Sequence, residues 1–133
     1  MGSGNLQPAK RTYWLIAGLV IAFLDFGSIA VRAEKGMAAH YSDAFQGKRT
    51  AEGSIFDQEG LTAATHEEYA FGTKVKVTNL KTNESVVVTV TDRLAPGNTT
   101  IIDISRKAAR EIGIERVGRA RVSVEVQPVE SVQ

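Results

Sequence analysis

The sequence predicts a small, mostly β domain with one short helix, closed into a barrel. Valine-rich segments alternate with polar residues at the period of a β-strand. A single stretch carries both a helix start signal and a helix stop signal. The 133 residues, 43% hydrophobic and 23% charged, suit one globular domain. Short strands in so small a domain favour a closed barrel, because closure removes the exposed sheet edges.

The N-terminal third differs from the rest. A basic pair precedes the apolar residues 13–24, about twelve in number, which end at Asp25. A membrane-spanning helix needs about 20 apolar residues. Followed by small residues, this pattern predicts a secretory signal peptide over residues 1–33, cut after Ala33. The alternative is an uncleaved N-terminal membrane anchor, because the apolar character resumes after Asp25.

The part that follows the predicted cut is nearly neutral. From Glu34 onward there are 13 Lys and Arg against 14 Asp and Glu, a net charge of −1. This balance gives no electrostatic reason to expect a nucleic-acid partner. The chain has no cysteine, so the domain must be held by its core without disulfides, and a lipidated N-terminal cysteine is excluded.

The first strands can be taken in order. Residues 36–41 are expected to start the fold as a strand that turns Tyr41 inward. Residues 74–80 and 85–91 are predicted to form a β-hairpin, with Val75 and Val77 on one face. Asn83 lies in the polar turn between them and suits an unusual backbone angle.

The helix and the remaining strands complete the pattern. Residues 100–104 form a short strand. Ser105 is a good N-cap for the helix, and Gly113 ends it as a left-handed residue. The last strand covers residues 120–126. Its expected inward residues are Val122, Val124 and Val126, and its expected outward residues are Arg121, Ser123 and Glu125.

Carboxylates are the best candidates for chemistry. His40 and His66, with scattered carboxylates, are too few ligands for a zinc site. The sequence also has no glycine-rich phosphate loop, so we expect no metal and no cofactor. Asp92 follows a valine-rich strand and precedes a loop, where burial can raise its pKa and suit it to general acid catalysis. Alternatively, Asp92 caps a turn and pairs with Arg93 at the surface.

For the other polar residues, a structural or solvent-exposed role is the simpler interpretation. Asp103, between isoleucines, is expected to point outward or to bind backbone N–H groups near the helix start. His66 could assist a carboxylate or hold substrate, but a lone loop histidine is usually only solvated. Residues 47–56 could line a groove for a sugar or an acidic ligand, or could form an ordinary exposed loop.

Together, the segments "GMAAHYSDAFQGKRTAEGSIFD", "FGTKVKVTNLKTNESVVVTVTDR" and "IIDISRKAAREIG" resemble the rare lipoprotein A (RlpA) family over residues 36–126. The resemblance implies a six-stranded double-psi β-barrel over residues 34–127, followed by a tail, 128–133. It also implies an exported lytic transglycosylase of the periplasm or cell envelope, acting on peptidoglycan glycan strands. We expect the protein to be a monomer. Expansins, which loosen wall polysaccharides without hydrolysis, share this barrel.

The resemblance carries two candidate catalytic residues. The family aspartate falls on Asp92, and the arginine after it is Arg93, although the usual Gly-Pro that follows is replaced here. The family histidine follows "TAA" directly. Counted back from "FGT" it is His66, whereas counted forward from "TAA" it is Thr65.

The family glutamate is missing, since its position is Ser54. Glu52, two residues earlier, would share a face with Ser54 if this segment were a strand. We expect Thr50, Glu52, Ser54 and Arg93 to bind substrate. Two hypotheses stay open: a lytic transglycosylase in which Asp92 acts as acid and then base, and a non-catalytic wall-binding domain of the expansin kind.

Overall fold

The computed structural model describes residue 4 and residues 32–129. The apolar core of the predicted leader, 13–24, lies outside these residues, as does the end of the predicted tail. Within the described residues, no helix combines the length and the apolar character needed to cross a membrane. Ala33, the predicted last residue of the leader, is the first residue of a strand.

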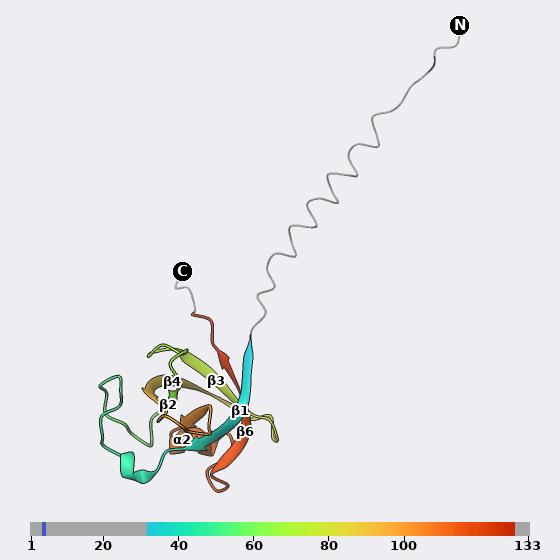
Figure 1. The fold of residues 1–133 in the computed structure, drawn as a ribbon. Coiled ribbons are helices and arrows are strands. Elements are labelled where there is room, and N and C mark those ends of the chain that lie inside the picture. The colour runs from blue at the N-terminus through green and yellow to red at the C-terminus, as the bar shows by residue number, and fades with distance from the viewer. Residues whose placement is uncertain (1–3, 5–31, 130–133) are drawn as a thin grey trace. The chain divides into compact units, whose positions relative to one another are not determined.

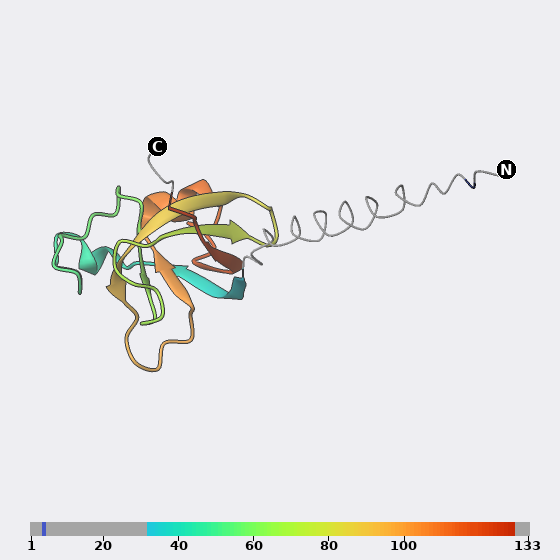
Figure 2. The same cartoon turned by 90° about the horizontal axis from the view of Figure 1, so that it is seen from above.

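The described chain contains six strands and one α-helix, with a short 3-10 helix after the first strand (Figure 1). The strands are β1 (Ala33–His40), β2 (Thr62–Thr65), β3 (Lys74–Asn79), β4 (Ser85–Arg93), β5 (Ile102–Ile104) and β6 (Arg119–Val126). The helices are η2 (Asp43–Phe45) and α2 (Arg106–Glu111). In Figure 2 the loop after β1, teal to green, and the gold loop after β4 extend away from the strands.

The strands form a closed barrel in the order β1-β5-β2-β4-β3-β6. Two pairs, β1 with β5 and β2 with β4, are parallel, and the other four pairs are antiparallel. Closure pairs every strand on both sides and leaves no free edge for another chain. The predicted closed barrel with one short helix is therefore confirmed.

The core follows the predicted alternation. Val75 and Val77 of β3 are fully buried, and α2 contributes Ala108 and Ala109. The other fully or almost fully buried aliphatic residues of this core are Ala38, Ala63, Val88, Val90, Ile102, Ile104, Ile112, Ile114, Val122 and Val124. The small residues of α2 let the helix pack close to the barrel.

The predicted boundary residues are largely confirmed. The Ser105 hydroxyl accepts a hydrogen bond from the Ala108 N–H as the N-cap of α2, and its own proton bonds the Gly60 carbonyl. Gly113 has φ of 75° and Asn83 has φ of 64°, both left-handed. Two burial predictions for β6 are wrong. Val126 is 46% exposed because it is the last residue of its strand, and Ser123 is only 7% exposed.

One irregularity in β4 determines how the site is built. Along β2 and β4, Ala63 pairs with Val90, but the next residue, Ala64, pairs with Asp92. Thr91 is thus an extra residue on β4, as in a β-bulge. Val86, Val88 and Val90 face the core, so strict alternation would have turned Asp92 inward as well. The bulge places Asp92 beside Ala64, on the outer face of the sheet.

Candidate active site

Asp92 is the centre of a network of hydrogen-bond donors at the end of β4. Its Oδ2 accepts the Tyr41 hydroxyl proton at 3.0 Å. Its Oδ1 accepts the backbone N–H groups of Ala51 and Arg93, each at 2.9 Å. Both oxygens therefore act as hydrogen-bond acceptors. The side chain remains partly exposed, so the carboxylate is fixed in orientation and still accessible.

The loop between Gly47 and Phe56 folds back on itself and docks on Asp92. Arg49 and Ile55 form a bridge across the loop, and the Thr50 N–H donates to the Ser54 carbonyl at 2.8 Å. At its tip, the Glu52 N–H donates to the Thr91 carbonyl at 3.0 Å, next to the Ala51 bond to Asp92. The predicted polar loop is therefore a wall of the Asp92 site.

Three predicted substrate-binding residues lie in this loop. The Thr50 side chain is almost buried and contacts the Ser54 hydroxyl at 2.9 Å. Ser54 is exposed, and so is Glu52. Glu52 occupies a turn rather than a strand, so the same-face argument that linked Glu52 to the Ser54 position does not apply.

Tyr41 contacts the candidate catalytic residue Asp92, and sequence reasoning missed this contact. Its ring is 7% exposed and stacks on Phe56, with centroids 4.2 Å apart. Ala64 and Leu94 complete this second apolar cluster. The sequence predicted that Tyr41 is buried, but not that it lies outside the barrel core or that its hydroxyl bonds a residue 51 positions away. Burial raises the pKa of Tyr41 well above its usual range, and the nearby charge of Asp92 adds to this shift.

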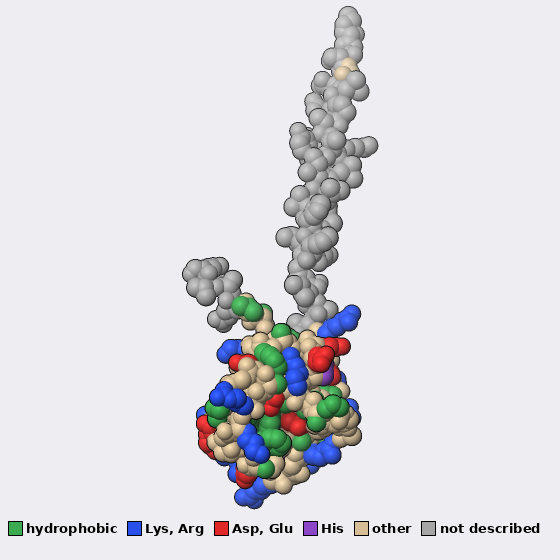
Figure 3. Space-filling view, turned by 60° about the vertical axis from the view of Figure 1, so that its left-hand side comes forward, with side chains coloured by type: hydrophobic (Ala, Val, Ile, Leu, Met, Phe, Trp, Pro, Cys, Tyr) green, Lys and Arg blue, Asp and Glu red, His purple; other side chains and the backbone are tan. Residues whose placement is uncertain are grey.

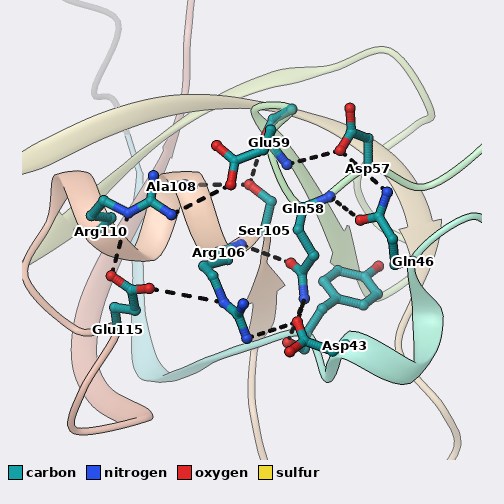
Figure 4. Close-up of polar contacts among 12 residues, drawn as sticks. Asp43, Gln46, Asp57, Gln58, Glu59, Ser105, Arg106, Ala108, Arg110 and Glu115 are labelled. Atoms are coloured by element: carbon teal, nitrogen blue, oxygen red, sulfur yellow. Dashed lines mark hydrogen bonds and ion pairs between the residues drawn. The ribbon is translucent and has the colours of Figure 1, made fainter.

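Gln58 holds Tyr41 and its loop against the helix start (Figure 4). Its Nε2 donates to the Tyr41 carbonyl at 2.9 Å and to Asp43 Oδ1 at 3.2 Å. Its Oε1 accepts the Arg106 N–H at 2.8 Å. The Arg106 guanidinium also pairs with Asp43 at 2.7 Å. The side chain of Gln58 thus joins three segments: the end of β1, the loop and α2.

We expect the free energy of unfolding to fall as the pH rises above about 10, the usual tyrosine pKa. Burial raises the pKa of Tyr41, and burial together with Glu34 raises that of Tyr69. A raised folded pKa means that the stabilisation is complete below the unfolded pKa and is lost as the pH approaches the folded pKa. Urea unfolding between pH 8 and 11.5 measures this loss.

Tyr41→Phe and Tyr69→Phe provide the matched comparison for this alkaline loss. Each removes one late-titrating phenol, so each should make the decline of the free energy of unfolding less steep than in the wild type. An unchanged slope in both variants would contradict the assigned cause.

The Arg93 side chain contacts Phe71, and its Nη1 donates a long bond of 3.5 Å to the Asp92 backbone carbonyl. Its guanidinium carbon lies 3.9 Å from the centroid of the Phe71 ring, a cation–π contact. Phe71 is 40% exposed. Arg93 and Phe71 therefore form a cationic, aromatic surface next to the Asp92 site, which suits the predicted substrate-binding role of Arg93.

The structure places His66 away from the Asp92 hydrogen bonds. Thr65 continues the β2 ladder, pairs with Arg93 and Ile102, and is fully buried, so it is not a bulge. His66 is the first residue after the strand, and its Nε2 lies 3.0 Å from Glu34 Oε2. Tyr69 donates to the same oxygen at 2.7 Å. Among residues 32–129, no hydrogen bond joins His66 to Asp92. The catalytic role of His66 stays a prediction.

The rest of the described surface gives no second candidate centre. Residues 32–129 bring no three His, Cys, Asp or Glu side chains into a group that could hold a metal ion. A hollow of about 810 Å³ lies beside residues 71–74, Val87 and residues 126–129, and contains none of the predicted site residues. Figure 3 shows acidic and basic side chains interspersed on one face, without a continuous patch of either sign.

Comparison with known proteins agrees with this fold. The family model described as lytic transglycolase matches residues 33–124. A probable endolytic peptidoglycan transglycosylase RlpA of Synechocystis is 43% identical over 134 residues, covering 91% of this chain and 41% of that protein. The endolytic peptidoglycan transglycosylase RlpA of Campylobacter jejuni is 43% identical over 91 residues, covering 68% and 33%. The chain thus spans well under half the length of these relatives.

A solved structure shares the architecture. Apo expansin of Clavibacter michiganensis superposes with a TM-score of 0.60 at 24% identity, covering 76% of this chain and 53% of that one. At this identity the likeness shows the fold alone. It confirms the double-psi β-barrel that the resemblance implied, and it leaves the chemistry to the site residues.

Proposed function

Because the chain belongs to the RlpA-like lytic transglycosylase family, we propose that it cleaves peptidoglycan glycan strands and leaves 1,6-anhydro ends. The observation that carries this proposal is the geometry of Asp92. A carboxylate fixed by three donors, yet partly exposed at the end of a rigid strand, is suited to proton transfer on a bound polymer. The matched family model and the named relatives support the same activity.

The reaction needs two proton transfers. A carboxyl group protonates the leaving glycosidic oxygen as the bond from C1 breaks. The sugar's own 6-hydroxyl then attacks C1, and a carboxylate accepts its proton. Asp92 can perform both steps in sequence, as acid and then as base. No water is consumed, so the absence of a carboxylate at Ser54 does not remove the logic of the reaction.

Substrate binding is assigned to the walls around Asp92. The folded loop offers the exposed Glu52 carboxylate and the exposed Ser54 hydroxyl, which the almost buried Thr50 hydroxyl holds in place. Arg93 with Phe71 offers a cationic, aromatic surface. Sugar rings combine hydroxyl edges with apolar faces, so both kinds of wall suit a glycan strand.

His66 enters the proposal as an assisting group. Because its Nε2 is bound to Glu34 and it has no hydrogen bond to Asp92 among the described residues, we expect His66→Ala to reduce turnover less than Asp92→Asn does. The lost pair is half-exposed and should lower the free energy of unfolding by about 1 kcal/mol or less. Turnover of glycan strands and urea unfolding measure both effects. A turnover loss equal to that of Asp92→Asn would instead give His66 a direct catalytic role.

The proposed activity places the domain outside the cytoplasm, in the periplasm or cell envelope, where its substrate lies. The predicted leader over residues 1–33 supports this location, as signal peptide or as membrane anchor. The partner is the glycan strand, and we propose that the barrel acts as a monomer without a cofactor or metal.

The test is a product analysis. The full chain is incubated with glycan strands stripped of their stem peptides, and the products are separated and identified by mass spectrometry. Fragments with 1,6-anhydro ends are expected, at a mass one water below hydrolysis products. Intact strands would overturn the proposal, and reducing-end fragments would point to hydrolysis instead.

A second candidate is a non-catalytic wall-binding domain of the expansin kind. The serine at position 54 favours it, because this chain lacks the family carboxylate there. It predicts that the protein sediments with insoluble peptidoglycan at physiological salt but creates no new glycan ends. The sedimentation assay run beside the product analysis therefore separates the two candidates.

A further inference from the structure

A second carboxylate lies on the same outer face as Asp92. Asp103 of β5 pairs with Ala64 of β2, and Ala64 pairs with Asp92 of β4. Paired residues of neighbouring strands project from the same side of a sheet. Asp103 and Asp92 therefore flank Ala64 on one face, and Ala39 of β1, the partner of Asp103 on its other side, continues the row.

Ala64, with its small side chain, lies between the two carboxylates. Ala64 is 3% exposed, so its methyl group is covered, and the Tyr41 ring belongs to the cluster that covers it. Adjacent strands lie about 4.8 Å apart, which puts the Asp92 and Asp103 backbones about 10 Å apart. Carboxyl pairs that act on a glycosidic bond stand about 5 to 9.5 Å apart. The backbone separation slightly exceeds this range of carboxyl separations, so the two side chains must lean toward each other across the Tyr41 ring to act on one linkage.

Tyr41 lies close to both carboxylates. The Tyr41 hydroxyl donates to Asp92, and the Tyr41 backbone N–H donates to the carbonyl of Ile104, the residue after Asp103. The negative charges of both aspartates contribute to its raised pKa, after burial. Asp92 and Asp103 therefore belong to one electrostatic environment rather than to two separate surfaces.

The hydrogen bonds of Asp103 differ from those of Asp92. Asp103 Oδ1 accepts the Thr100 hydroxyl at 2.7 Å, and Oδ2 accepts a long bond of 3.4 Å from the Asn98 amide. Both donors are side chains of one loop. Asp92 instead accepts two fixed backbone N–H groups. The Asp103 Oδ2 is thus the more weakly engaged carboxylate oxygen of the two residues.

We propose that Asp103 is the second catalytic carboxyl group of the site and fills the chemical role left open at Ser54. This inference rests on the proposed transglycosylase function. The protonated Asp103 carboxyl donates its proton to the leaving oxygen as the bond from C1 to that oxygen breaks. The 6-hydroxyl oxygen bonds to C1, and its proton passes to the Asp92 carboxylate. The two groups end with exchanged protonation and return to the starting state through solvent.

If Asp103 only anchored the loop through Thr100, losing either partner of that bond should have the same effect. Thr100 therefore provides the matched control. Asp103→Asn keeps an oxygen that can accept the Thr100 hydroxyl, so it preserves the tether but removes the acid. Thr100→Val removes the tether but leaves the acid. We expect Asp103→Asn to lower kcat by at least about 100-fold, the usual contribution of a general acid, with little change in sedimentation on peptidoglycan. We expect Thr100→Val to lower the melting temperature and keep most of kcat.

Activity on a substrate with a good leaving group is a second measurement, and a purely structural role of Asp103 would not change it selectively. An aryl glycoside that releases 4-nitrophenolate needs no protonation of its leaving group. Asp103→Asn should recover most of its activity on such a substrate, whereas Asp92→Asn should not.

The outcomes separate the two proposals. If the wild-type chain forms no anhydro ends, the proposed function and this inference fall together. If the wild type is active and Asp103→Asn is equally active, only the inference is overturned. Equal losses in Asp103→Asn and Thr100→Val, or no recovery on the aryl glycoside, would also overturn the assignment of Asp103 as acid.

Discussion

Asp92→Asn is expected to lower the turnover of stem-free glycan strands by about 100-fold to 10,000-fold, the range for losing a general acid–base group. The amide oxygen of asparagine can still accept the N–H groups of Ala51 and Arg93. The loop therefore stays docked, and the substitution removes proton transfer with little effect on structure. Production of anhydro ends, followed by mass spectrometry against time, measures the loss.

Two controls make this result specific to chemistry. Far-UV circular dichroism and urea unfolding should show Asp92→Asn folded, with a free energy of unfolding close to that of the wild type. Tyr41→Phe removes the third donor to Asp92 and leaves the carboxylate in place, so its activity should fall less. If Asp92→Asn produces as many anhydro ends as the wild type, Asp92 has no part in the reaction.

Gln58→Leu is expected to lower the free energy of unfolding by roughly 2 to 5 kcal/mol. The substitution leaves the Tyr41 carbonyl and the Arg106 N–H without their side-chain partner. Each buried polar group that loses its hydrogen bond costs about 1–3 kcal/mol. Gln58 is 6% exposed, so water cannot easily replace the lost bonds. Urea unfolding followed by circular dichroism at 25 °C measures the change.

Gln46 offers the matched control for Gln58. It lies in the same loop, and its Oε1 accepts the Gln58 N–H at 2.7 Å, but its side chain is exposed. Gln46→Ala should therefore cost about 1 kcal/mol or less, because water can satisfy the freed group. Equal costs for the two variants would show that burial of the Gln58 amide is not what stabilises the loop. Activity should fall in Gln58→Leu as well, since Tyr41 depends on this contact.

Alternation and capping in the sequence were enough to predict most of the fold. The hairpin of β3 and β4, the helix limits at Ser105 and Gly113, and the strand β6 all follow local rules, and the structure confirms them. The strand β2 was not predicted from its residues. Its four residues, Thr-Ala-Ala-Thr, carry little strand preference. They form a strand because β4 and β5 supply partners on both sides.

The site was predictable only in part, because it depends on contacts distant in sequence. Asp92 could be selected from its place at the end of a valine-rich strand. Tyr41 could not, since its bond to Asp92 joins residues 51 positions apart. The same holds for Asp103, whose relation to Asp92 appears only when β2 is inserted between β5 and β4. His66 was ambiguous by one residue. The structure keeps Thr65 in the β2 ladder and leaves His66 just outside it, and the role of His66 stays a prediction.

The extra residue Thr91 in β4 has a consequence for how such a domain can change. If the strand lost the bulge but kept Thr91, Ala64 would pair with Thr91, and Asp92 would follow Val86, Val88 and Val90 toward the core. The carboxylate would then exchange solvent for hydrocarbon, and the site would lose its exposed acid. Deleting Thr91 would instead put the aspartate directly after Val90, on the outer face, without any bulge. The number of residues between Val90 and the aspartate therefore determines whether β4 needs a bulge to keep the carboxylate outside.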